Sequence, residues 1–148
     1  MPQETLDLLR VDMTTGEARR EPLPETWRLL GGRSLSARLL SEECDPTCDP
    51  LGPDNLLVLA GGVLTGTAAP TSGRLSVGAK SPLTGGIKEA NAGGNPAQHL
   101  ARLGIRAIVV KGQPADPSAR FGLEVGESGA RLVPADDLAG LWTYATCE

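Results

Sequence analysis

The chain has 148 residues, of which 40% are hydrophobic and 3% aromatic, and its formal net charge is -4 at pH 7. This length suits a single folded domain with a core of aliphatic side chains, and the composition excludes a disordered chain. The acidic balance also argues against a nucleic-acid-binding protein, because such proteins usually carry a basic excess.

No segment of the sequence is expected to enter a membrane. The longest apolar runs, at 56–60 and 105–110, are far too short to span a bilayer. The first nine residues carry acidic side chains and lack the apolar centre of a secretory signal. The three cysteines match neither a disulfide framework nor a zinc or iron–sulfur spacing; they are Cys44, Cys48 and Cys147. We therefore expect free thiols and a cytoplasmic location.

The N-terminal part of the chain predicts a hairpin and a helix. Residues 6–13 and 17–23 have strand character and flank a Thr-Thr-Gly turn signal. A short helical piece and a longer helix with leucines on one face follow at 25–30 and 34–43. Ser34 can serve as the N-cap of the longer helix. The proline-rich residues 44–53 then predict a surface connector.

The middle of the chain predicts four strands and one helix. The strands are expected at 55–60, 74–79, 87–90 and 105–111. Asn95 and Pro96 open the clearest helix, because asparagine can cap a helix and proline is tolerated at its first position. Gly104 ends this helix. The order of strand, glycine-rich loop, helix start and strand favours an anion at the helix N-terminus.

The C-terminal part predicts a second hairpin and short helical segments. Residues 121–125 and 131–133 flank the sequence Gly-Glu-Ser-Gly, which is a hairpin signal. Asp136 is expected to cap a short helix that extends to Leu141. Residues 143–148 then have the pattern of another helix start.

The glycine-rich stretch 69–94 is the strongest candidate for a functional surface. It holds six glycines among other small residues, and Gly61 and Gly62 lie just before it. Small residues let a backbone approach a ligand closely. The stretch contains neither GxxxxGK[ST] nor GxGxxG, which are the usual nucleotide-binding patterns. A surface for a phosphorylated cofactor and a set of tight turns in a β-rich domain therefore both stay open.

Individual polar residues in and near this stretch have two interpretations each. Arg74 can form forked hydrogen bonds with a phosphate or a polar ring edge, or it can be a solvated arginine. Asn91, between two alanines, suits a metal or phosphate contact, but asparagine also adopts left-handed backbone geometry. Lys80 and Lys88 add positive potential. His99 is the only histidine, and with no partner triad in view a surface or packing role is favoured.

Six motifs, in a fixed order, span most of the chain. They are LLRVDMTTGE, GGRSLSARLL, SGRLSVGAKSPLTGG, ANAGG, HLARLGIRAIVVKG and DDLAGLW. Together they resemble the N-terminal domain of the tungsten-containing aldehyde:ferredoxin oxidoreductases. The resemblance runs from about Leu8 to Trp142, and its most specific part is SGR followed by SPLTGG.

The resemblance implies an α+β fold of mixed or antiparallel sheets with a few short helices. In the family this fold forms a pseudo-twofold base that supports two molybdopterin cofactors, which jointly hold tungsten (or molybdenum). The resemblance implies that Arg74 and Gly93 contact the pterin and that Asn91 contacts a magnesium ion bridging the pterin phosphates. The implied reaction oxidises an aldehyde with water to a carboxylic acid and passes electrons through a 4Fe–4S cluster to ferredoxin. No catalytic residue is assigned in this chain.

The chain also departs from the family pattern. The family continues beyond residue 148 with a second pterin-binding loop and cluster-binding cysteines spaced C-x-x-C-x-x-x-C. We therefore expect residues 1–148 to form one partial domain that binds neither the cluster nor a complete bis-pterin site by itself. Three interpretations stay open: a fragment or split subunit completed by a second chain, a non-catalytic cofactor-binding or assembly module, and a truncated inactive product.

Overall fold

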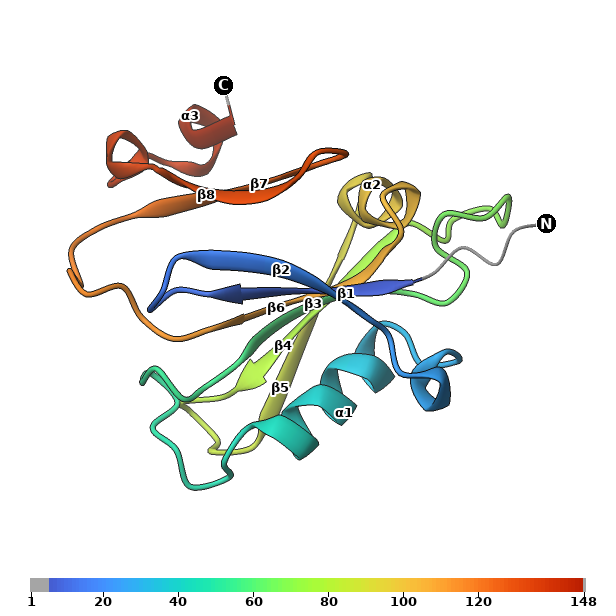
Figure 1. The fold of residues 1–148 in the computed structure, drawn as a ribbon, viewed down its shortest axis with the longest axis horizontal. Helices are drawn as coiled ribbons and strands as arrows, with labels where there is room; N and C mark the ends of the chain where they lie inside the picture. The colour runs from blue at the N-terminus through green and yellow to red at the C-terminus, as the bar shows by residue number, and fades with distance from the viewer. Residues whose placement is uncertain (1–5, 148) are drawn as a thin grey trace.

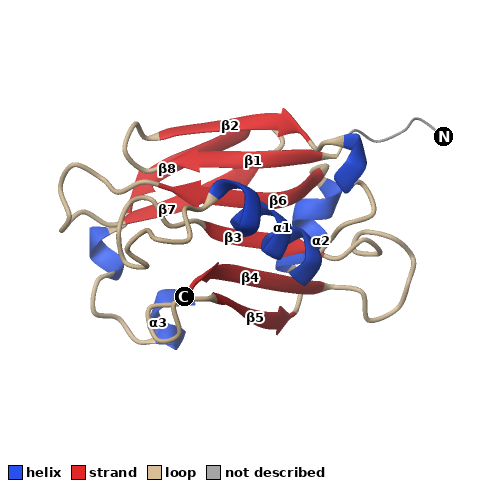
Figure 2. Ribbon diagram, turned by 90° about the horizontal axis from the view of Figure 1, so that it is seen from below, coloured by secondary structure: helices blue, strands red, loops and turns tan. Residues whose placement is uncertain are grey.

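A six-stranded mixed sheet forms the centre of the molecule in the computed structural model, which describes residues 6–147 (Figure 1). Its strands are β1 (Asp7–Asp12), β2 (Glu17–Pro22), β3 (Leu57–Gly61), β4 (Arg74–Lys80), β5 (Ile87–Gly93) and β6 (Ile105–Lys111). The strand order is β2-β1-β6-β3-β4-β5, so β2 and β5 form the two edges (Figure 2). Strands β1 and β6 are parallel, and the other neighbours are antiparallel.

Helices and a second, two-stranded sheet cover the two faces of this central sheet (Figure 1). The small sheet pairs β7 (Phe121–Gly126) with β8 (Gly129–Pro134). The helices are α1 (Arg33–Glu43), α2 (Pro96–Arg102) and α3 (Thr143–Cys147), with 3-10 helices η1 (Glu25–Trp27) and η2 (Asp136–Leu138). The predicted α+β class, with mixed and antiparallel sheets and a few short helices, is confirmed. No helix within residues 6–147 is long and apolar enough to cross a membrane.

The core consists of two apolar layers, one on each face of the sheet. On one face, Leu35 and Leu39 of α1 pack against a cluster that includes Leu8. On the other face, Leu9 and Ile108 pack against α2 and the β7–β8 hairpin. Leu8 and Leu9 are both buried because consecutive strand residues point to opposite faces. The aliphatic core predicted from the composition is confirmed.

Small residues let α1 lie close to β4. A Cβ atom added at Gly78 would lie 3.0 Å from both the Cβ and the Oγ of Ser36 on the helix. Ser36 is buried, and its hydroxyl donates to the carbonyl oxygen of Arg33 in the same helix. The absence of a side chain at Gly78 therefore lets the first turn of α1 approach the sheet closely at this point of β4.

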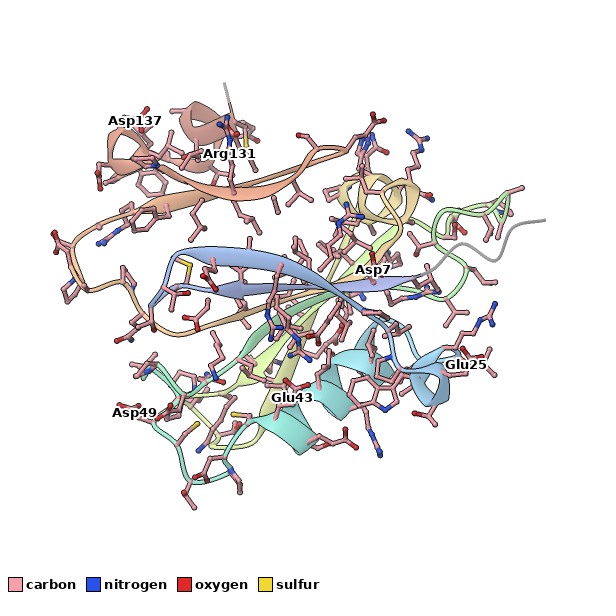
Figure 3. The ribbon with its side chains drawn as sticks, viewed as in Figure 1. Asp7, Glu25, Glu43, Asp49, Arg131 and Asp137 are labelled. Atoms are coloured by element: carbon pink, nitrogen blue, oxygen red, sulfur yellow. The ribbon has the colours of Figure 1, made fainter. Side chains whose placement is uncertain are left out.

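An arginine fixes the other end of α1 to the sheet. Arg10 on β1 donates from Nε to Glu21 on β2 at 2.6 Å and from its terminal nitrogens to Glu43, the last residue of α1, at 2.5 and 2.8 Å. Glu43 is labelled in Figure 3. The pKa of Arg10 is raised, chiefly by the hydrogen bond to Glu43. One side chain thus joins two strands and a helix.

The predicted strands and hairpins are confirmed, as is Asn95 at the N-cap of α2 with Pro96 at its first position, whereas the caps predicted at Ser34 and Asp136 are wrong. Gly32, with φ of 53°, occupies the N-cap of α1, and Ser34 lies inside the first turn, where its hydroxyl exchanges hydrogen bonds with Gly31. Asn95 is at the N-cap of α2, but its side chain makes no capping bond. Asp136 follows the N-cap of η2, and its carboxylate instead accepts a hydrogen bond from the backbone N–H of Arg120.

Candidate functional site

The paired strands β4 and β5 bring the three predicted site residues together at one end of the sheet edge. Arg74 is paired with Gly93, and Ser76 is paired with Asn91. Directly opposed residues of an antiparallel pair share a face, so these four residues lie on the same side of the sheet. Strand β5 was predicted to end at residue 90, but its pairing continues to Gly93. This extension places Asn91 and Gly93 on a strand rather than in a loop.

Arg74 and Asn91 contact each other directly. The Nε of Arg74 donates to the Oδ1 of Asn91 at 2.5 Å, and both residues are exposed. Among the described residues, nothing else forms a hydrogen bond with the guanidinium of Arg74. Its two terminal nitrogens therefore remain as donors for a ligand, in the fork geometry that matches phosphate and carboxylate groups. The amide oxygen of Asn91 also keeps a lone pair, because a carbonyl oxygen accepts two hydrogen bonds.

Glu89 orients the side chain of Asn91. Its Oε1 accepts from the Ser76 hydroxyl at 2.6 Å and from the Asn91 amide nitrogen at 3.4 Å. A carboxylate only accepts hydrogen bonds, so the NH₂ group of Asn91 must face Glu89 and the amide oxygen must face Arg74. The pKa of Glu89 is lowered, first by the hydrogen bond from Ser76 and then by those from Asn91 and Arg33.

The charge of Glu89 is balanced within the same cluster. Arg33, the first residue of α1, donates from Nε to Glu89 Oε2 at 3.2 Å and places a terminal nitrogen 3.0 Å from the same oxygen. The Glu89 side chain is 11% exposed, whereas that of Arg33 is 78% exposed. Since Arg33 pairs with Glu89, the guanidinium of Arg74 is left as the uncompensated positive charge of this cluster.

The glycines near Arg74 have different roles. A Cβ atom added at Gly73 would lie 2.8 Å from the carbonyl oxygen of Gly94, so the fold itself requires glycine at that position. At Gly93 an added Cβ would meet only the Nη1 of Arg74, at 3.9 Å. No contact in the described part of the chain explains the glycine at Gly93. A ligand that approaches the backbone closely would explain it.

The two lysines considered from the sequence do not join this cluster. Lys80 is at the opposite end of β4 from Arg74, and its ammonium donates to the backbone carbonyls of Pro46 and Cys48. Lys88 pairs with Ala79 and so lies on the opposite face of β5 from Asn91. His99 is exposed on α2, in agreement with a surface role. Within residues 6–147, no group of three His, Cys, Asp or Glu side chains could hold a metal ion.

Sequence reasoning missed Glu89, Ser76 and Arg33. Residues two positions apart on a strand share a face. Ser76 is two residues from Arg74 on β4, and Glu89 is two residues from Asn91 on β5. This spacing is the sequence signal that could have indicated Ser76 and Glu89. Arg33 lies more than fifty residues away in sequence from Glu89. No local pattern connects these two residues, because only the packing of α1 on the sheet brings them together.

Comparison with known proteins identifies the family of this chain. The family model described as "Aldehyde ferredoxin oxidoreductase, N-terminal domain" matches residues 8–148. The chain belongs to this family. The resemblance seen in the sequence motifs is therefore confirmed, and the β4–β5 edge is part of the N-terminal domain of an aldehyde ferredoxin oxidoreductase family member.

Curated relatives and a solved structure agree with this assignment. The chain is 48% identical over 113 residues to the tungsten-containing aldehyde ferredoxin oxidoreductase of Pyrococcus furiosus and 49% identical over 113 residues to that of Thermococcus kodakarensis. Each match covers 74% of this chain and 18% of the relative, so the matched part of the chain spans less than a fifth of the length of these enzymes. The active site complex BamBC of benzoyl coenzyme A reductase, in complex with 1,5-dienoyl-CoA, superposes with a TM-score of 0.88 and 29% identity. That match covers 95% of this chain and 21% of the other.

The lowered pKa of Glu89 predicts a pH-dependent contribution to stability. Because the folded-state pKa is below that of an unfolded glutamate, the contribution is present above the unfolded pKa and is lost as the pH falls through the folded-state pKa. In urea titrations, the difference in unfolding midpoint between the native chain and Glu89→Gln should be largest near neutral pH and should vanish in acid. Glu127→Gln, on the exposed β7–β8 turn, is the matched control. A Glu89→Gln difference that does not change with pH would contradict this role.

Proposed function

We propose that residues 74–93 form part of the cofactor-binding surface of a tungsten-containing aldehyde:ferredoxin oxidoreductase. In this proposal Arg74 and Gly93 would contact the pterin, and Asn91 would supply an oxygen ligand to a magnesium ion held together with the pterin phosphates. The observation that carries the proposal is the Arg74–Asn91 pair, which lies exposed on a sheet edge of the family's N-terminal domain. The curated relatives, which are tungsten-containing by name, support the choice of metal, although the same site chemistry suits molybdenum.

The residues present fit such a cofactor. The free fork of the Arg74 guanidinium suits anionic phosphates and polar ring edges. The Asn91 oxygen is a hard ligand of the kind that magnesium prefers, and magnesium is commonly held by few protein ligands together with phosphate oxygens. The open space at Gly93 leaves room for a ligand against the backbone.

The residues of this chain act in binding and orientation. Glu89, itself held by the Ser76 hydroxyl, accepts from the Asn91 amide nitrogen and so keeps the amide oxygen toward Arg74, and Arg33 neutralises Glu89 so that its charge does not repel phosphates. When bound, the tungstopterin supplies the oxidation of an aldehyde and water to a carboxylic acid, with electrons passed on through a 4Fe–4S cluster. An aldehyde and ferredoxin are the substrate and electron acceptor that we propose for the whole enzyme.

The cluster itself is not assigned to the described cysteines. Cys44 and Cys48 lie near Lys80, at the end of β4 away from Arg74, and Cys147 is exposed at the end of α3. We propose that the cluster, like the second half of the pterin site, is bound by other parts of the enzyme.

Replacing Arg74 tests the pterin contact. Equilibrium binding of molybdopterin to the chain should weaken by roughly 10- to 100-fold in Arg74→Ala, which corresponds to the loss of hydrogen bonds from a charged group. Arg131→Ala is a matched control, because Arg131 is an exposed arginine on β8 that pairs with Glu124. Equal molybdopterin binding by the native chain and Arg74→Ala would remove Arg74 from the proposal.

Replacing Gly93 separates a ligand contact from a requirement of the fold. In Gly93→Ala the unfolding midpoint should stay the same or rise slightly, because alanine loses less backbone entropy than glycine in a strand, while molybdopterin binding should weaken. Gly78→Ala should behave in the opposite way, since its new Cβ would lie 3.0 Å from Ser36 and lower the midpoint. Gly86→Ala, which has only one atom near its added Cβ, controls for the substitution itself. Unchanged molybdopterin binding in Gly93→Ala would argue against close approach at this position.

Replacing Asn91 tests the magnesium contact. Magnesium should strengthen molybdopterin binding by the native chain relative to binding in EDTA, and Asn91→Ala should lose most of this increment. Asn91→Asp should retain it, because a carboxylate is also an oxygen ligand for magnesium. Isothermal titration with and without magnesium measures the increment. A full magnesium increment in Asn91→Ala would show that the ion does not contact this residue.

A further inference from the structure

Two cysteine side chains touch in the connector between α1 and β3. The Sγ atoms of Cys44 and Cys48 are 3.6 Å apart, which is close to the contact distance of two non-bonded sulfur atoms, and both residues are half-buried. Figure 3 labels Asp49, the next residue along this connector. The sequence predicted free thiols, and the three cysteines are unpaired. It did not predict that two of them are neighbours in space.

The turn that carries these cysteines is fixed by its own hydrogen bonds. Cys44 caps the C-terminal end of α1, where its N–H donates to the carbonyl oxygen of Leu40 at 3.1 Å. The N–H of Cys48 donates to the carbonyl oxygen of Asp45 at 3.0 Å. The Asp45 carboxylate accepts from both the N–H and the hydroxyl of Thr47, each at 2.7 Å. The two thiols therefore face each other on a preformed backbone.

A lysine and an asparagine attach this turn to the end of β4. The Lys80 ammonium donates to the carbonyl oxygens of Pro46 and Cys48, at 2.6 and 2.5 Å. The Asn55 side chain accepts from the backbone N–H of Lys80 and donates to the carbonyl oxygen of Pro50, at 3.1 and 2.7 Å. Both flanks of the cysteine pair are thus held, which keeps the two sulfurs next to each other.

Cys44 is accessible from a pocket of about 300 Å³ between the end of α1 and the β4–β5 turn. Leu40, Cys44, Lys80 and Ile87 are among the residues that line the pocket. Cys48 does not line it. A small oxidant can therefore reach Cys44 from this pocket, and Cys48 lies next to it as the second thiol.

We propose that Cys44 and Cys48 form a redox-active dithiol that a low-molecular-weight disulfide converts into an intramolecular disulfide. The Cys44 thiolate attacks one sulfur of the small disulfide, whose S–S bond breaks and releases one thiol. The Cys48 thiolate then attacks the Cys44 sulfur of the mixed disulfide, which forms the Cys44–Cys48 bond and releases the second thiol. Two electrons pass from the cysteine pair to the oxidant, and the two protons of the cysteines end on the two small thiols.

The order of attack agrees with the surroundings of Cys48. Burial, together with the hydrogen bond to Cys44, raises the pKa of the Cys48 thiol, and Asp45 acts in the same direction while Lys80 opposes it. A thiol with a raised pKa is a weak first attacker. Its position next to Cys44 still makes it the closest nucleophile for the mixed disulfide. The site lies at the far end of β4 from Arg74, so this proposal does not depend on the proposed function.

The experiment treats the native chain with oxidised glutathione, blocks the remaining thiols with N-ethylmaleimide, and maps the peptides by mass spectrometry. The peptide that contains Cys44 and Cys48 should be two hydrogens lighter and carry no label, and reduction should restore both labels. Cys147 is exposed and serves as an internal control that forms only a mixed disulfide with glutathione. Cys48→Ser should accumulate the mixed disulfide at Cys44.

Two results would overturn the proposal. One is that Cys44 and Cys48 both take up the label under conditions in which Cys147 is fully glutathionylated. The other is a mixed disulfide at Cys44 that persists in the native chain as it does in Cys48→Ser.

A second measurement is independent of oxidation: phenylarsine oxide, which bridges paired thiols, should bind the native chain and Cys147→Ser with one-to-one stoichiometry. Phenylarsine oxide should not bind Cys44→Ser or Cys48→Ser. Binding by these variants equal to that of the native chain would also refute the proposal that Cys44 and Cys48 act as a dithiol.

Discussion

The antiparallel register of β4 and β5 is the constraint on which the candidate site depends. Because Arg74 pairs with Gly93 and Ser76 with Asn91, the four positions share one face of the sheet. A shift of one residue would send Asn91 to the opposite face from Arg74 and separate Glu89 from Ser76. The register is in turn supported by α1, which can approach β4 only where Gly78 has no side chain. Helix packing, strand register and site geometry are therefore one linked arrangement.

The glycines near the site fall into two groups: those that the packing of the fold requires and those that it does not. Gly73 and Gly78 have no room for a side chain, so the fold accounts for them. Gly93 has room for a side chain, because an added Cβ would meet only the Nη1 of Arg74, at 3.9 Å. Ordinary packing therefore does not explain this glycine. A ligand that lies against the backbone at Gly93, on the face that carries Arg74 and Asn91, does explain it and supports the proposed cofactor contact.

The sequence predicted the strands, the two hairpins and the main helices because their signals are local. Apolar runs, a Thr-Thr-Gly turn and a Gly-Glu-Ser-Gly turn each lie within a few residues. The end of β5 was missed because alanine, asparagine and glycine have low strand propensity, so that only pairing with β4 reveals the strand. Two caps were misplaced, because Gly32 and Ala135 rather than Ser34 and Asp136 occupy the N-cap positions, whereas Asn95 is an N-cap whose side chain makes no capping bond. Arg74, Asn91 and Gly93 were named through the family resemblance, whereas the Glu89 network needs the register and the packing of α1.

The parallel pairing of β1 with β6 has a consequence for the way this domain assembles. Strand β6 lies between β1 and β3 in the sheet, yet it is the last of the six strands along the chain. Until residues 105–111 are in place, the β1–β2 hairpin and the β3–β4–β5 unit cannot join into one sheet. During synthesis on the ribosome, the two pieces cannot pair through β6 until this strand emerges, and long-range pairing of this kind slows folding. Strand β6, which has five buried residues in a row, therefore completes the sheet only late in synthesis.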